Sequence, residues 1–263
     1  MVEFTGTLGR ALDEVWGTAP LLAVPVVLTF LSFDAVRRVL AFEGFHVGIK
    51  FVFPEDVPTL WSFVSLPQAP GSGVSPVGIL LLFLGALIGA YLSAGYLGSI
   101  KENLERGDFD FMTNAGRFFL DFLWFRLLLS LFELLLILAG LVLGPLIILA
   151  LPVVLFISYL IYGVPYIIVS EGMGFEGALR KSVGLALTGG EYLEYGLKYL
   201  AFVALVSIPM TIVTVDFGLP GLVAGVLVSP FVSLVLSTAT MTFFLEDEGR
   251  VSLKLPLPLE ELD

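Results

Sequence analysis

The chain has 263 residues, 57% of them hydrophobic and only 14% charged, with a formal net charge of −11. Cysteine is absent and His46 is the single histidine, which excludes disulfides, thiolate metal sites and multi-histidine metal sites. The acidic balance argues against nucleic acid or anionic lipid as a main partner. We therefore expect neither a metal nor another cofactor. The scarcity of Cys, Asn and Gln is also typical of proteins from thermophiles.

Six apolar segments separate almost all of the charges. A helix rises about 1.5 Å per residue, so about 20 apolar residues cross a hydrocarbon core of about 30 Å. Each segment reaches that length, which predicts an all-α integral membrane protein built as a six-helix bundle. Residues 1–245 would form one transmembrane domain and residues 246–263 a cytoplasmic tail. The predicted spans are 18–40, 76–100, 118–140, 143–169, 192–215 and 219–245.

Lysine and arginine are distributed unevenly between the two sides of the predicted bundle. Because insertion resists the transfer of these cations, the side that carries more of them is predicted to be cytoplasmic. We therefore expect a multi-pass protein of the plasma membrane with both termini in the cytoplasm. The cytoplasmic set is Arg10, Lys101, Arg106, Arg117, Arg180, Lys181, Lys198, Arg250 and Lys254, and the outer set is Arg37, Arg38 and Lys50.

Three segments outside the spans have readable patterns. Residues 2–16 carry an apolar stripe that ends at Trp16, and residues 175–187 repeat apolar residues at helical spacing beside two cations. Both patterns favour cytoplasmic helices that lie in the headgroup plane. Residues 42–75 hold two aromatic and β-branched runs around Pro54 and Pro58. These runs favour a small β-hairpin over the outer mouth, or a segment that dips into the interface.

Small residues recur along the second and sixth spans. Gly85, Gly89 and Ser93 are four residues apart in the second span, and Gly221 and Gly225 repeat the spacing in the sixth. Small side chains let two helices approach closely, and this close packing holds bundles together in lipid. The pattern predicts helix contacts within one subunit, an interface in a homo-oligomer, or a seam along which helices move.

The polar residues of the third span are the sharpest functional signal. They are Asp121, Arg126, Ser130 and Glu133. Arg126 and Glu133 are seven residues apart, which places them within about 20° of one helix face. A charge in hydrocarbon costs at least about 2.5–3.5 kcal/mol, so this stripe must face protein or water. Glu133 either pairs with Arg37 or Arg38, or belongs to a path for a substrate or proton.

All eight tyrosines fall in the cytoplasmic halves of the predicted spans. Most of them fit an aromatic belt at the headgroup level. Tyr91 and Tyr159 lie deeper, where a hydroxyl needs a partner, and we expect them to continue the polar path into a cavity open to the cytoplasm. Prolines at 145, 152 and 165 interrupt the fourth span as kinks or hinges.

The end of the chain alternates apolar residues with polar residues and prolines. The prolines exclude a helix and a central strand, so the segment predicts an extended strip with one apolar face. It would dock on a partner protein, on a neighbouring subunit or on its own bundle. The apolar residues are Val251, Leu253, Leu255, Leu257 and Leu259.

The segment from Tyr166 to Ser182 resembles the six-span prokaryotic families of the glycerophosphodiesterase membrane-domain and DUF4013 type. It contains an apolar run, an acidic-glycine turn at Glu171 and a basic helix in which Ala178, Leu179, Arg180 and Ser182 match the family pattern. The resemblance implies a shared bundle with a cytoplasmic loop after the fourth span, and no particular activity.

No phosphate-binding glycine loop, paired catalytic carboxylates, Ser/His/Asp set or HExxH motif is present, so an enzyme is not expected. Two classes of function remain. The first is a transport component, channel-like or carrier-like, whose path runs past Arg126, Ser130 and Glu133 toward the tyrosines. The second is a scaffold that does not transport and assembles partners on the cytoplasmic side through its interfacial helices and its tail.

Overall fold

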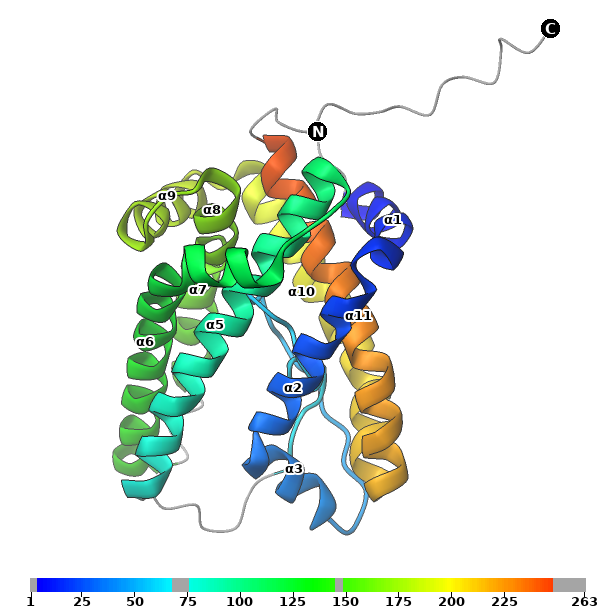
Figure 1. Ribbon diagram of the computed structural model, residues 1–263. Helices are drawn as coiled ribbons and strands as arrows, with labels where there is room; N and C mark the ends of the chain where they lie inside the picture. Colours follow the sequence, from blue (N-terminus) through cyan, green and yellow to red (C-terminus); the bar gives the residue numbers. More distant parts are fainter. Residues whose placement is uncertain (1–3, 68–75, 145–148, 248–263) are drawn as a thin grey trace, which may run out of the picture.

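The computed structural model describes residues 4–67, 76–144 and 149–247, which form a bundle of helices (Figure 1). Within these residues, six helical runs are long and apolar enough to cross a membrane, which confirms the predicted all-α, six-span class. The chain is therefore a multi-pass membrane protein with a lipid bilayer as its surroundings. The runs are Phe4–Leu31, Phe83–Arg106, Phe111–Gly140, Leu151–Glu171, Gly190–Asp216 and Gly218–Glu246.

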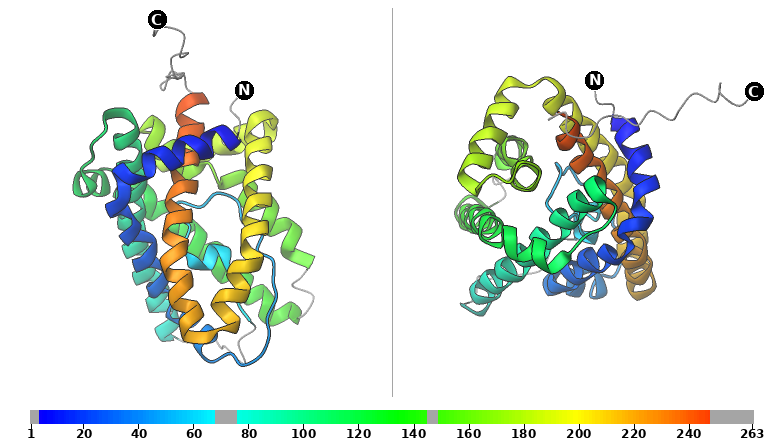
Figure 2. Two further views of the ribbon diagram at one scale, coloured as in Figure 1. Left: turned by 90° about the vertical axis from the view of Figure 1, so that its right-hand side faces the viewer. Right: turned by 45° about the horizontal axis from the view of Figure 1, so that its top comes forward.

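Both ends of the described chain lie on one side of the bundle, which we call the terminal side (Figure 1). There α1 (Phe4–Glu14) crosses near the end of α11 (Gly218–Asp247), and Arg10 forms an ion pair with Glu246 (Figure 2). The opposite side carries α3 (Phe33–Leu40) and is called the α3 side. An even number of crossings, here six, returns the chain to the side on which it began, so both ends lie together. The location of the terminal side in the cytoplasm stays a prediction.

The first span is interrupted twice. α1 continues through a 3₁₀ helix (η1, Val15–Leu22) into α2 (Ala23–Leu31), and α3 begins only after a break at Ser32, where ψ is 60°. Pro20 lies inside η1, and its missing amide donor favours the tighter 3₁₀ form there. The predicted span of 18–40 thus covers the end of η1 together with α2 and α3, whereas the continuous helical run covers Phe4–Leu31.

α5 (Pro76–Arg106) and α6 (Phe111–Leu143) form the most extensive helix pair. A Cβ atom on Gly95 would lie 2.5 Å from the Phe111 ring, and one on Gly98 would lie 2.6 Å from Asn114 Cβ, so only glycine permits this approach. Asp110 begins α6 by accepting a hydrogen bond from Thr113 N at 3.1 Å. The Thr113 side chain and then its amide hold the pKa of Asp110 below its usual range.

The fourth span divides into α7 (Leu151–Ile161) and α8 (Val164–Glu171), with the break just before Pro165, as the prolines predict. α9 (Phe175–Thr188) follows on the terminal side as the predicted helix over 175–187. Its buried face is made of small side chains, whereas Leu187 is 73% exposed. The buried residues of α9 are Ala178, Ser182 and Ala186.

α10 (Gly190–Thr211) returns to the α3 side and ends in a π-helical turn (η3, Ile212–Asp216). α11 packs closely on this turn. A Cβ on Gly221 would overlap the carbonyl oxygen of Val213, and one on Gly225 would lie 2.6 Å from Thr214 Oγ1. Both glycines therefore make contacts within the chain.

Seven of the eight tyrosines are buried, so the predicted aromatic belt is wrong. They form a packed aromatic core in the terminal half of the bundle. The rings of Tyr162 and Tyr192 stack at 4.1 Å, and those of Tyr195 and Phe243 at 4.3 Å. Tyr162 Oη donates to the carbonyl oxygen of Tyr192 at 2.6 Å. The hydroxyls of Tyr159 and Tyr162 thus find protein partners where the sequence suggested a water-filled cavity.

Candidate intramembrane site

Residues 41–67 leave α3, run into the bundle and turn back, and we call them the re-entrant segment (Figures 1 and 2). The predicted β-hairpin is wrong, because residues 41–67 contain no strand and only one short helix, α4 (Leu60–Phe63). At the tip, Phe53 stacks on Tyr162 of the fourth span at 5.9 Å. The alternation in the sequence reflects an arm with one exposed apolar face, formed by Phe45, Val47, Ile49 and Phe51.

The ascending arm is matched in length to α10. The His46 amide donates to Asp216 Oδ1 at 2.8 Å, and the Lys50 amide donates to Ser207 Oγ at 2.9 Å. Residues 46 to 50 span about 13 Å as an extended chain, and residues 207 to 216 span about 13 Å as a helix. The two side-chain acceptors, Ser207 on α10 and Asp216 on η3, are therefore spaced to receive amides from this extended arm.

The descending arm is held in the same way. The Ser65 amide donates to Thr211 Oγ1 at 2.9 Å, and the Leu60 amide donates to Thr29 Oγ1 at 3.2 Å. The Trp61 indole donates to the Thr29 carbonyl oxygen at 2.8 Å. Irregular backbone at membrane depth is tolerated only where its polar groups are paired inside the protein or reach water. Side chains from distant helices supply that pairing here.

Local chemistry forms the turn at the tip. Pro54 and Pro58 exclude a regular helix or a central strand between them. Asp56 Oδ1 accepts a hydrogen bond from the Val57 amide at 2.9 Å. Thr59 and Ser62 then form a capping box that starts α4. The sequence Pro54 to Ser62 therefore carries its own signals for an extended approach, a turn and a helix start.

At the tip, the Asp56 carboxylate forms an ion pair with Arg126 of α6 inside the bundle. Asp56 Oδ2 lies 2.7 Å from Arg126 Nη2, and the Asp56 side chain is only 6% exposed. Arg126 Nη2 also donates to Ser93 Oγ of α5 at 3.0 Å. A Cβ on Gly89 would lie 3.4 Å from Arg126 Cζ, so this glycine leaves room for the guanidinium. Arg126 lies 17 residues before Leu143, about 25 Å along α6 from its α3-side end.

Glu55, the neighbour of Asp56, lies beside this ion pair with different partners. The Ser62 hydroxyl donates to Glu55 Oε2, and Tyr166 Oη donates to the Glu55 carbonyl oxygen at 2.7 Å. Among the residues that the structure describes, no lysine or arginine lies within ion-pair distance of the Glu55 carboxylate, whereas Asp56 has Arg126. The tip therefore holds one carboxyl group in an ion pair, Asp56, and one without a cation in direct contact, Glu55.

The other members of the third-span stripe become more exposed toward the α3 side. The Arg126 side chain is 25% exposed, Ser130 is half-buried and Glu133 is exposed. The predicted pairing of Glu133 with the first span is wrong. Arg37 and Arg38 both bind Asp34 instead, at 3.1 and 2.5 Å.

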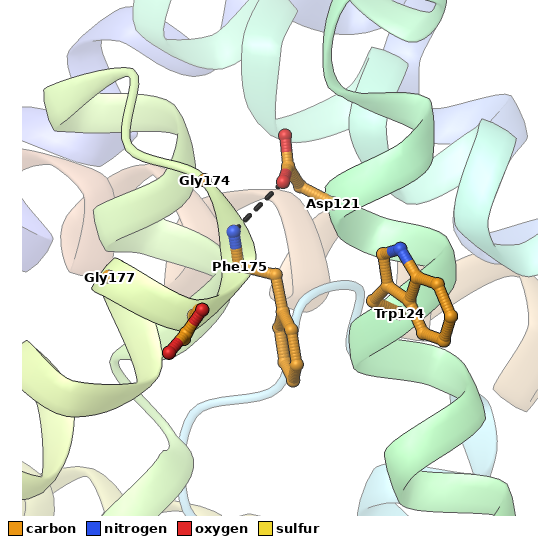
Figure 3. A pocket seen from close by; sticks show the side chains of 6 residues that line it. Asp121, Trp124, Gly174, Phe175 and Gly177 are labelled. Atoms are coloured by element: carbon orange, nitrogen blue, oxygen red, sulfur yellow. Dashed lines mark hydrogen bonds between the residues drawn. The ribbon is translucent and has the colours of Figure 1, made fainter.

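Asp121 belongs to a separate place on the terminal side (Figure 3). Its Oδ1 accepts a hydrogen bond from the Phe175 amide at 2.8 Å, beside an open cleft of about 500 Å³ that Trp124 also lines. The carboxylate thereby caps the first turn of α9 from another helix. It is not brought together with Arg126 and Glu133.

Replacing Asp121 with alanine is expected to destabilise the α9 region by about 1 kcal/mol, as loss of a helix cap does. Hydrogen exchange of the Phe175 to Ala178 amides should accelerate. Asp121→Asn keeps an acceptor oxygen and should exchange nearly as slowly as the original protein. Equal exchange in the alanine variant would contradict the capping role.

The remaining predicted residues have local partners or lie elsewhere. Tyr91 Oη donates to Met112 Sδ at 3.0 Å, and Tyr159 Oη donates to the Ala186 carbonyl oxygen at 2.8 Å. A Cβ on Gly85 would meet open space. The docking strip of Val251, Leu253, Leu255, Leu257 and Leu259 lies outside the described residues.

Sequence reasoning missed Glu55 and Asp56, which appear in the sequence as loop residues. Two signals pointed to them. An acidic pair lies between two prolines and is flanked by apolar runs, and hydroxyls at Ser207 and Thr211 lie four residues apart within an apolar span. Hydroxyls on one face of a span that accept hydrogen bonds from a non-helical segment indicate buried backbone nearby.

Comparison of the chain with protein-family models, with curated proteins and with solved structures finds no match in any of the three.

Proposed function

We propose that this protein is a membrane transport component whose route enters from the α3 side and ends at the re-entrant tip. The observation that carries the proposal is the third-span stripe. Glu133, Ser130 and Arg126 share one face of α6. Glu133 is exposed, Ser130 and Arg126 are half-buried, and Arg126 binds the buried Asp56 of the tip. A polar stripe that leads from an exposed carboxylate to a buried charged cluster is typical of a substrate or ion path.

The re-entrant segment supports the same proposal. Broken helices and irregular backbone near the middle of a membrane are the usual construction of transporter sites. The terminal half beyond the tip is filled by stacked rings such as Tyr162 and Tyr192. This packing favours a conformation in which the site is accessible from the α3 side alone, with the tip as the barrier.

Cysteine accessibility tests the route directly, because the natural chain has no cysteine. Ser130→Cys should react with a charged, membrane-impermeant thiol reagent added to the α3 side of intact vesicles. Leu131→Cys is the matched control, since Leu131 is 55% exposed on another face of the same helix and should stay unreactive in lipid. Reaction from one side only would also establish the orientation of the chain.

Equal protection of the Ser130 and Leu131 cysteines would rule out the route. Reaction of Ser130→Cys from the terminal side alone would reverse its direction and contradict the proposed access. The scaffold alternative depends on the interfacial helices and on the tail beyond residue 247, and it stays a prediction from the sequence.

A further inference from the structure

We infer that Glu55 is a reversible proton-binding site at the barrier, an inference that rests on the proposed transport function for its role in coupling. Glu55 lies at the tip of an irregular segment enclosed by helices, next to a carboxylate that already has its cation. The two adjacent carboxyl groups therefore have different partners. Asp56 is bound by Arg126, and Glu55 accepts a hydrogen bond from the Ser62 hydroxyl.

Glu55 is half-buried and has no cation in direct contact, which gives it a reason to bind a proton. Partial removal of a carboxylate from water carries a free-energy cost, and the group avoids that cost by becoming neutral. Asp56 avoids it by pairing with Arg126 at 2.7 Å. Two adjacent carboxyl groups with contrasting surroundings can have different roles. Asp56 stays ionised, and Glu55 is the group that binds and releases a proton.

A proton fits this site better than a metal ion. Hard cations take about six or more oxygen ligands, usually from several carboxylates. No group of three or more His, Asp or Glu side chains that could hold a metal occurs among the described residues. Glu55 instead has one side-chain hydrogen bond, from Ser62, and that hydroxyl can rotate to accept when the carboxyl group is protonated.

The charged and titratable groups around Glu55 come from several elements, and their sum gives protonation a mechanical consequence. Asp56 and Arg126 offset each other, so protonation of Glu55 removes the negative charge that attracts the Lys50 side chain of the ascending arm. Protonation therefore weakens the electrostatic attraction between the tip and this arm. The surrounding groups are Lys50, Asp56, Arg126, Tyr166 and Tyr199.

Carbodiimide labelling tests the site without any assay of transport. Dicyclohexylcarbodiimide partitions into apolar surroundings and reacts with protonated carboxyl groups. Peptide mass spectrometry should find the label on Glu55, with a yield that falls about tenfold per pH unit once the group ionises. Glu55→Gln should remove this label, and Glu194→Gln, which changes an exposed carboxylate paired with Lys198, should retain it.

Absence of label on Glu55 at low pH, or a yield that does not change with pH, would overturn the inference. Loss of labelling on addition of Na⁺ or Mg²⁺ at constant pH and ionic strength would overturn it in favour of a metal ion. These outcomes are independent of the Ser130→Cys test. A labelled Glu55 in a bundle with an unreactive Ser130→Cys would leave the proton site intact and remove only the transport route.

Discussion

Replacing Arg126 with alanine is expected to destabilise the protein by about 3–5 kcal/mol, because it leaves Asp56 as a buried charge without a partner. The Asp56 side chain is 6% exposed and Arg126 is its ion-pair partner in the described structure. The loss should appear as a large fall in the unfolding midpoint of the detergent-purified protein. It should also shift the protein toward aggregates in size-exclusion chromatography.

The double variant distinguishes the ion pair from simple loss of side-chain volume. Arg126→Met together with Asp56→Asn removes both charges, and it should recover most of the stability that Arg126→Met alone loses. Arg126→Lys keeps the charge but loses the planar guanidinium that reaches both Asp56 and Ser93, so it should fall between the two. Stabilities that simply add in the double variant would show that the two residues are not coupled.

The second large effect is expected at Gly48, where the two arms of the re-entrant segment touch. A Cβ on Gly48 would overlap the Cβ and Oγ of Ser65. The arms cannot separate freely, because His46 Nε2 lies 3.0 Å from the Ser65 carbonyl oxygen and the Ser65 amide is bound to Thr211. Gly48→Ala should therefore lower the free energy of unfolding by about 1–3 kcal/mol, as overpacking does.

Removing the opposing side chain provides the control. Ser65→Gly keeps the amide and carbonyl that bind Thr211 and His46, so the Gly48→Ala, Ser65→Gly double variant should regain much of the loss in thermal unfolding. Gly184→Ala is a second control, since a Cβ there meets nothing within 4 Å in helix α9 and should stabilise by about 0.5–1 kcal/mol. A Gly48→Ala variant as stable as the original would show that the arms are not in contact.

The predicted ion pairs show which contacts can be inferred from a single sequence and which cannot. The spacing of Arg126 and Glu133 indicated correctly that a charged stripe follows one face of α6, because helical periodicity is a local property. The partner of Arg126 was not predicted, since Asp56 is 70 residues earlier in a segment without helical periodicity. Arg37 and Arg38 were assigned to a distant carboxylate, although Asp34 lies within one helical turn.

The resemblance to the glycerophosphodiesterase membrane-domain and DUF4013 families stays a prediction. The helix that carries its Ala178, Leu179, Arg180 and Ser182 pattern is present as α9. Its buried contact is made by the small residues Ala178 and Ser182, with the Ser182 hydroxyl donating to the Leu160 carbonyl oxygen at 2.8 Å. The part of the motif that packs on α7 is thus structural, whereas the exposed Arg180 pairs with Glu176 one turn earlier at 2.5 Å.

The sequence by itself determined the membrane class, the approximate spans, the break before Pro165 and the helix over 175–187. Each follows from a local requirement, because a segment in lipid must satisfy its own backbone by forming a helix and must present apolar side chains. Only the tertiary structure decided the course of residues 41–67. Four of their amides donate to side chains of Thr29, Ser207, Thr211 and Asp216 on other elements. A segment whose backbone is hydrogen-bonded by distant side chains has no helical or strand periodicity in its own sequence. The position of the tip that carries Glu55 and Asp56 is therefore visible only in the assembled bundle.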